Sequence, residues 1–82
     1  MTTTFKNVII YTTNVCPYCQ QAKRLLTERE IPFEEISLEG NNELRTQLSQ
    51  ENNGWRTVPM IFADKKFIGG YDDLHALLKS QD

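Results

Sequence analysis

The hydrophobic and polar positions of the chain alternate between strand-like and helix-like patterns. Residues 8–11 are continuously apolar, which is typical of a strand buried on both faces of a sheet. Apolar residues then recur every three or four positions from Cys19 to Leu26, and this spacing predicts an amphipathic helix. Ile31-Pro32 predicts its end, because the residue before a proline disfavours helical geometry.

The rest of the chain continues the alternation of strands and helices. The expected elements are a strand at 33–38, a helix at 42–52, a hairpin of strands at 60–63 and 66–68, and a last helix capped by Asp72. Glu34 and Glu35 indicate that the second strand lies at a sheet edge. A right-handed crossover makes the first two strands parallel, and the hairpin adds antiparallel strands. The predicted fold is α/β, a four-stranded mixed sheet flanked by three helices in one domain, 1–82.

Composition narrows the classes of protein to consider. The 82 residues allow one small core. Nine basic and 11 acidic residues form no excess of positive charge, so neither nucleic acid nor an anionic membrane is the expected partner. No apolar stretch approaches the roughly 20 residues of a membrane span, and residues 1–7 lack the apolar core of a secretory signal. We therefore expect a soluble cytoplasmic monomer.

The only two cysteines lie three residues apart, in Cys16-Pro17-Tyr18-Cys19. If Cys16 begins a helix, Cys19 lies one turn further on, with Cβ atoms about 5–6 Å apart, so the sulfurs can bond. The unpaired N–H groups at the helix start favour the thiolate form of Cys16. Pro17 suits the first turn, where its missing N–H group costs nothing. The motif therefore predicts a redox-active pair.

Counting the available ligands argues against a structural zinc site within one chain. A structural zinc site needs four ligands, usually cysteine or histidine. The chain has two cysteines and one histidine, His75, which is distant in sequence. We expect no metal site, and we interpret His75 as an exposed helix residue.

Three segments together resemble the dithiol glutaredoxins. They are Cys16-Pro17-Tyr18-Cys19, Thr57-Val58-Pro59 before a strand, and Gly69-Gly70-Tyr71-Asp72-Asp73 before the last helix. The resemblance implies a thioredoxin-like fold and a glutathione-dependent oxidoreductase that reduces protein–glutathione mixed disulfides and protein disulfides. It implies Cys16 as the nucleophile and Cys19 as the resolving thiol. Glutathione would be the reducing co-substrate, and the protein would hold no bound cofactor. The protein would act in electron transport and cell redox homeostasis.

The resemblance also implies a glutathione site. A cis Val58-Pro59 bond would leave the backbone of Val58 free to pair with the extended tripeptide. Asp73 is the expected salt-bridge partner of the γ-glutamyl ammonium group. The full set of implied binding residues is Tyr18, Thr57, Val58, Pro59, Gly70, Tyr71, Asp72 and Asp73.

One position departs from the family pattern. Many members have lysine or arginine three positions before the first cysteine, and this chain has Thr13. Arg56, Lys23 or Arg24 could hold the glycine carboxylate of glutathione instead, although each is equally well explained as a solvated charge. Tyr11 and Trp55 are expected to be packing or rim residues, and no functional role is assigned to them.

Two other functions remain open at the level of sequence. One is a redoxin reduced by thioredoxin reductase that supplies ribonucleotide reductase, against which the segment 69–73 argues. The other is a dimer that holds a [2Fe–2S] cluster through the first cysteine and glutathione of each subunit. Family members that bind such a cluster usually lack the proline or second cysteine of the motif, and this chain has both.

Overall fold

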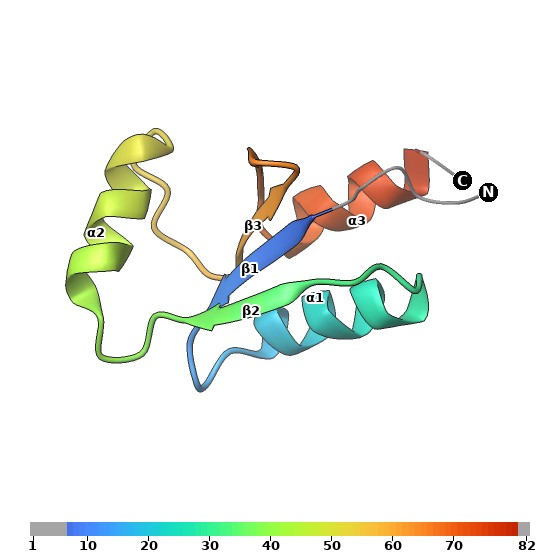
Figure 1. The fold of residues 1–82 in the computed structure, drawn as a ribbon, viewed down its shortest axis with the longest axis horizontal. Coiled ribbons are helices and arrows are strands. Elements are labelled where there is room, and N and C mark those ends of the chain that lie inside the picture. The colour runs from blue at the N-terminus through green and yellow to red at the C-terminus, as the bar shows by residue number, and fades with distance from the viewer. Residues whose placement is uncertain (1–6, 81–82) are drawn as a thin grey trace.

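The structure, a computed structural model, describes residues 7–80. Residues 1–6 and 81–82 lie outside this range. The prediction that residues 1–7 contain no secretory signal therefore falls almost entirely outside the described residues. The elements are β1 (Val8–Thr12), α1 (Pro17–Glu28), β2 (Glu34–Ser37), α2 (Asn42–Glu51), β3 (Met60–Ala63), β4 (Lys66–Gly69) and α3 (Tyr71–Ser80) (Figure 1). This order confirms the β-α-β-α-β-β-α prediction. Among the described residues, no helix is long and apolar enough to cross a membrane.

The four strands form one mixed sheet in the order β2-β1-β3-β4. β1 pairs in parallel with β2, placing Ile9 opposite Glu34, and pairs antiparallel with β3, placing Ile10 opposite Ile61. β4 continues the sheet antiparallel to β3. β2 is an edge strand with both glutamates exposed, as its charges predict.

The helices cover the sheet unequally. Alternate residues of a strand point to opposite faces. Ile10 packs into a core cluster with α1 and α3 residues, including Leu26 and Leu74, whereas its neighbour Tyr11 packs on the other face beside Leu48 of α2. Figure 1 shows α1 and α3 running beside the strands and α2 beyond the carboxyl ends of β1 and β2. The loops that leave β1 and enter β3 therefore emerge at the end of the sheet near α2.

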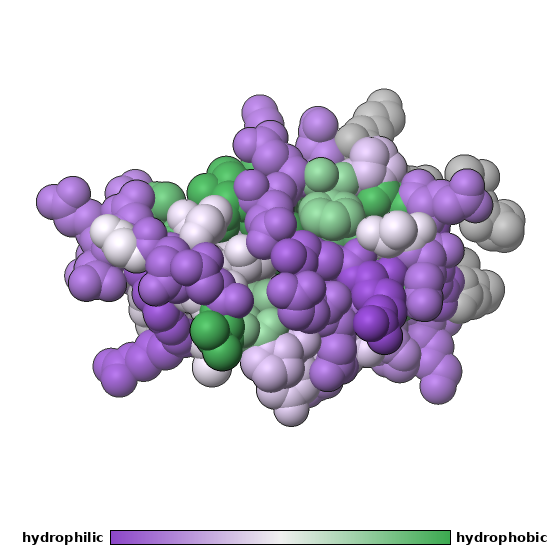
Figure 2. All heavy atoms as spheres, turned by 90° about the horizontal axis from the view of Figure 1, so that it is seen from below, coloured by the Kyte–Doolittle hydropathy of each residue, from purple (hydrophilic) through white to green (hydrophobic). Residues whose placement is uncertain are grey.

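Helix α1 begins as its local sequence predicts. Cys16 is the N-cap, with extended backbone, and Pro17 occupies the first helical position. The helix buries Cys19, Ala22 and Leu26 along one stripe. Figure 2 views the side on which α1 and β2 lie in Figure 1, and hydrophilic residues dominate that face. Burial of the stripe thus points the first turn, with its cysteines, toward the sheet.

The start of the last helix differs from the prediction. α3 begins at Tyr71, so Asp72 lies within its first turn, and the expectation that Asp72 is the N-cap is wrong. The preceding Gly69 has a φ of 128°, which lets the chain complete its turn early. Asp73 then accepts a hydrogen bond from the N–H of Gly70 at 3.0 Å, as the acidic member of a capping box does.

Candidate active site

The two cysteines occupy unequal positions at the start of α1. They are joined as a disulfide, with Cα atoms 5.2 Å apart. Cys16 is 8% exposed and Cys19 only 1%, so Cys16 is the more accessible sulfur. The backbone N–H of Cys19 donates to Sγ of Cys16 at 3.1 Å. In the reduced protein this donor and the helix dipole favour negative charge on Cys16.

The segment before β3 passes beside this sulfur. Sγ of Cys16 lies 3.7 Å from the carbonyl oxygen of Val58, although the two residues are 42 positions apart. The Val58–Pro59 peptide bond is cis, as the family resemblance implies. Within residues 7–80, the N–H of Val58 has no hydrogen-bond partner. It is therefore available to pair with an added extended chain.

The residues predicted to bind glutathione converge on one groove. Its volume is about 310 Å³, at the lower end of the range for small-molecule sites. The lining comprises Tyr18, Trp55, Thr57, Val58, Pro59, Gly70, Tyr71, Asp72 and Asp73. All of the residues implied by the resemblance are present. They come from α1, the loop before β3 and the start of α3, three places far apart in the sequence.

The groove has an aromatic side and an acidic end. Tyr18 is 57% exposed, and its ring centroid lies 6.3 Å from that of Tyr71. Asp72 and Asp73 lie in the first turn of α3, where their charges also favour the helix. An ammonium group can meet these carboxylates, while the N–H groups of the helix start suit a carboxylate. The end of the groove at α3 therefore suits a zwitterionic group.

Gly69 is the residue that permits this arrangement. A side chain on Gly69 would overlap the carboxylate of Asp73, and its φ of 128° disfavours any other residue. A side chain on Gly70 would be in ordinary contact with Trp55, 3.6 Å away. The first glycine is therefore required by the position of Asp73, whereas a side chain at the second would make only ordinary contacts with its neighbours.

Trp55 is the residue that sequence reasoning missed. Its indole ring lines the groove and makes an edge-to-face contact with Phe67, with centroids 5.2 Å apart. Its Nε1 is buried and has no hydrogen-bond partner among the described residues. The one available signal was its position two residues before Thr57. From sequence this position predicts a packing or rim residue and assigns it no role in the groove.

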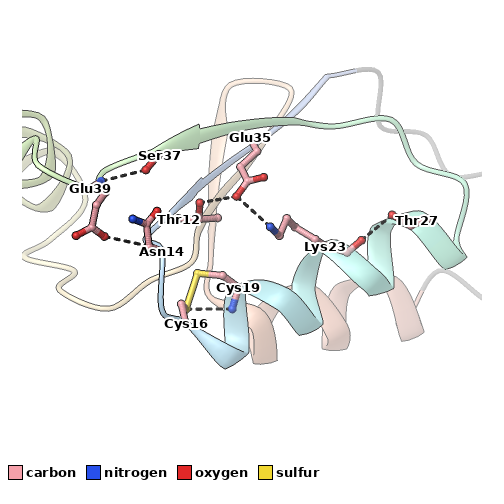
Figure 3. A network of polar contacts seen from close by, with 9 residues as sticks. All are labelled: Thr12, Asn14, Cys16, Cys19, Lys23, Thr27, Glu35, Ser37 and Glu39. Carbon is pink, nitrogen blue, oxygen red and sulfur yellow. Dashed lines mark hydrogen bonds and ion pairs between the residues drawn. A yellow bond between two sulfur atoms is a disulfide. The ribbon is translucent and has the colours of Figure 1, made fainter.

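The basic residues considered in place of the family's lysine have different surroundings. Lys23 lies on α1, and its Nζ is 3.1 Å from Oε2 of Glu35 on β2 (Figure 3). The hydroxyl of buried Thr12 donates to the same oxygen at 2.7 Å. Thr12 foremost, and then Lys23, lower the pKa of Glu35 by hydrogen bonding. This network ties α1 to the sheet edge and leaves Lys23 outside the groove lining.

The other positions are also outside the groove lining. Thr13 is half-buried, and Arg24 is exposed on α1. Arg56 lines a separate hollow beside the groove. The loop between Thr13 and Cys16 is held by the N–H of Asn14, which donates to Glu39 at 3.1 Å (Figure 3). No basic side chain therefore lines the groove among the described residues.

Comparison with known proteins agrees with this geometry. The family model for glutaredoxin matches residues 8–68. The chain belongs to the glutaredoxin family. Like the family, it is a thiol–disulfide oxidoreductase of thioredoxin-like fold, with Cys16 and Cys19 as its redox-active pair.

Individual glutaredoxins match over most of their length. A glutaredoxin of Pseudomonas aeruginosa is 49% identical over 70 residues, covering 85% of this chain and 82% of the relative. Glutaredoxin 3 of Escherichia coli K12 is 46% identical over 71 residues, covering 87% and 84%.

Solved structures show the same fold. The crystal structure of Francisella tularensis glutaredoxin 1, complexed with cacodylate, has a TM-score of 0.80 at 33% identity, covering 92% of this chain and 94% of that one. A buckwheat glutaredoxin–glutathione complex has a TM-score of 0.83 at 26% identity, covering 90% and 69%. The second match shows that a glutaredoxin of this shape binds glutathione.

Proposed function

We propose that this glutaredoxin is a glutathione-dependent reductase of protein–glutathione mixed disulfides and of protein disulfides. The observation that carries the proposal is the groove, which runs from the unpaired N–H of Val58, beside Cys16, to the carboxylates of Asp72 and Asp73. The buckwheat relative, whose structure contains glutathione, supports this choice of ligand.

The proposed binding mode uses both ends of the groove. The backbone of the tripeptide pairs with Val58 as an added strand, which brings its sulfur to Cys16. The γ-glutamyl ammonium group meets Asp73, with Asp72 beside it, and the γ-glutamyl carboxylate meets the N–H groups at the start of α3. Tyr18 and Tyr71 flank the ligand. Thr57, Pro59 and Gly70 line the groove in which it lies.

Deglutathionylation needs only Cys16. Its thiolate attacks the glutathione sulfur of a mixed disulfide, a new S–S bond forms, and the protein sulfur leaves as a thiolate that takes up a proton. The thiolate of a second glutathione attacks the bound glutathione sulfur. Glutathione disulfide then leaves, and the Cys16 thiolate is restored.

Reduction of a protein disulfide needs both cysteines. Cys16 attacks one substrate sulfur and releases the other as a thiol. Cys19, after losing its proton, attacks the sulfur of Cys16 and frees the second substrate thiol. The electrons lost by the two cysteines reduce the substrate, and the product is the Cys16–Cys19 disulfide. Two glutathiones reduce that disulfide and become glutathione disulfide.

A coupled assay tests the proposal. The protein is supplied with a glutathione mixed disulfide of a small thiol, glutathione, glutathione reductase and NADPH, and NADPH consumption is followed. We expect turnover that depends on both glutathione and the protein. A parallel reaction with thioredoxin reductase in place of the glutathione system should stay at background. Turnover only in the parallel reaction would replace glutathione with thioredoxin reductase as the source of electrons.

The proposal extends to the compartment, the oligomeric state and the partners of the protein. We propose a cytoplasmic monomer without a bound cofactor that acts on glutathionylated proteins and on ribonucleotide reductase. Anaerobic purification followed by size-exclusion chromatography and visible absorption tests the monomer and the cofactor. We expect a colourless monomer, whereas a coloured dimer would assign the protein to [2Fe–2S] cluster binding.

A further inference from the structure

Two exposed hydrophobic side chains flank the nucleophile. Among residues 7–80, Val15 and Tyr18 are the only large hydrophobic side chains that are exposed, at 92% and 57%. Val15 directly precedes Cys16, and Tyr18 follows Cys16 by two positions. Pro17, which lies between Cys16 and Tyr18, is also exposed. We call Val15, Pro17 and Tyr18 the apolar rim.

Neither the fold nor the glutathione groove accounts for Val15. Tyr18 lines the groove, whereas Val15 is absent from its lining and from both core clusters. A valine that is 92% exposed gains almost none of the free energy that burial of its side chain would provide. Isolated exposed hydrophobic residues are common, and the position beside the nucleophile is what distinguishes this one. Its apolar surface is available to a partner.

The backbone is anchored on both sides of Val15. The N–H of Asn14 donates to Oε1 of Glu39 at 3.1 Å (Figure 3). Cys16 is the N-cap of α1, and its Sγ accepts a hydrogen bond from the N–H of Cys19. These anchors present the side chain of Val15 at a defined place beside Cys16. The sequence from 7 to 22 contains no charged residue, so an apolar group of a partner would desolvate no charge on this segment.

The reaction itself brings a polypeptide to this place. When Cys16 attacks the glutathione sulfur of a mixed disulfide, the leaving protein sulfur is one S–S bond, about 2.0 Å, from the attacked atom. Glutathione occupies the groove, so the substrate polypeptide lies outside the groove and beside Cys16. Val15 is exposed, lies outside the groove lining and adjoins the nucleophile. The residues that flank the substrate cysteine therefore come within reach of Val15.

We propose that the apolar rim, through Val15, contacts the protein half of a protein–glutathione mixed disulfide and favours substrates with an apolar residue beside the glutathionylated cysteine. The proposal rests on the proposed function, because it places glutathione in the groove. Glutathione is common to all such substrates, so the groove cannot distinguish one protein from another. Val15 is a specificity-determining residue that selects among protein substrates and takes no part in the exchange of S–S bonds.

The test uses two glutathionylated peptides, identical except for leucine or asparagine directly after the modified cysteine. Pre-reduced protein is mixed with each peptide, and release of the peptide thiol is followed in a single turnover, so the readout needs no free glutathione. We expect the wild-type protein to release the leucine peptide about three- to tenfold faster, because part of the leucine side chain is buried against Val15. Val15→Thr, which adds a hydroxyl at nearly the same shape, should reduce the preference to less than about twofold, and Val15→Leu should retain it.

The matched control is Val15→Thr/Thr27→Val, which moves the valine to an exposed position near the other end of α1 at unchanged composition. It should behave like Val15→Thr. Recovery of the preference in this control would overturn the proposal, because general surface hydrophobicity would then be the cause. The mixed disulfide of glutathione and cysteamine, which has no flanking residue, should react equally with every variant. Urea unfolding checks that each variant is folded.

The remaining outcomes separate the competing explanations. Equal release of the two peptides by the wild-type protein would overturn the proposal. If Val15→Thr instead abolished a dimer in size-exclusion chromatography while both peptides reacted equally, the apolar rim would be a contact between two copies of the chain. Failure of glutathione as the reductant would appear separately, as absent turnover in the glutathione-coupled assay with the single-turnover preference intact.

Discussion

The backbone N–H of Cys19 donates a hydrogen bond to Sγ of Cys16, and the two residues differ in exposure, 1% against 8%. The same first turn therefore stabilises charge on the outer sulfur and shields the inner one. This asymmetry supports different roles for the cysteines, and the first prediction separates those roles.

Replacing Cys16 with serine should abolish every reductase activity, because the other cysteine of the chain, Cys19, is only 1% exposed and cannot attack a disulfide in its place. Replacing Cys19 with serine should preserve turnover of a glutathione mixed disulfide and remove the reduction of protein disulfides that needs both thiols. Both variants are measured in the glutathione-coupled assay and with an insulin-type protein disulfide. Deglutathionylation that survives in the Cys16→Ser protein would contradict the assignment of the nucleophile.

The two aspartates of α3 should contribute unequally to ligand binding. The carboxylate of Asp73 is oriented by the N–H of Gly70, whereas the exposed Asp72 has no such hydrogen bond to any residue in the described range 7–80. Asp73→Asn should raise the KM for a glutathione mixed disulfide about tenfold, equivalent to the roughly 1.4 kcal/mol of a charge-assisted hydrogen bond. Asp72→Asn should change the KM less. A larger effect at Asp72 would show that the ammonium group lies at the other carboxylate.

Gly69→Ala should destabilise the fold and weaken the groove together. The new methyl group would overlap the carboxylate of Asp73 at a backbone φ of 128°. We expect a loss of about 1–3 kcal/mol in the free energy of unfolding, together with a higher KM. Gly40→Ala is the matched control, since Gly40 also has a positive φ, of 74°, but open space around it. Urea unfolding and the coupled assay should show a smaller stability loss there, about 1 kcal/mol, and an unchanged KM.

The network of Glu35 should make stability depend on pH. Thr12 and Lys23 hold the pKa of Glu35 below its ordinary value, so the ionised carboxylate stabilises the folded state. This contribution is complete above the unfolded-state pKa of about 4.3 and is lost as the pH falls through the lower folded-state pKa. Glu35→Gln should lower the free energy of unfolding at pH 7 by at most about 1 kcal/mol, because the side chain is 39% exposed and screened by solvent.

Urea unfolding at several pH values from neutral to acid measures this difference. It should vanish in acid, where the wild-type carboxylate is also neutral. Glu34→Gln is the control, since the carboxylate of this exposed neighbour has no hydrogen-bond partner among residues 7–80. Equal pH dependence in the two variants would show that the contacts of Glu35 contribute nothing to stability.

Some of these features follow from local sequence. The apolar run at 8–11, the helical spacing from Cys19 to Leu26 and the charged edge strand each predict an element that the structure contains. Cys16 and Pro17 predict the start of α1, because an N-cap and its first turn depend on neighbouring residues. Local patterns do not indicate which distant segments lie together in the fold. The resemblance to glutaredoxins predicted that the three motif segments form one site.

The tertiary structure decided which side chains meet. Val58 lies beside Cys16 only because β1 and β3 are neighbours, and no periodicity records a contact across 42 residues. Lys23, a candidate for the groove, instead pairs with Glu35 because the face of α1 that bears it turns toward the edge strand. Trp55, interpreted from sequence as a packing or rim residue, lines the redox groove. The sequence alone determined the elements and the redox pair, since these depend on neighbouring residues; the groove and its charges depend on how distant elements pack.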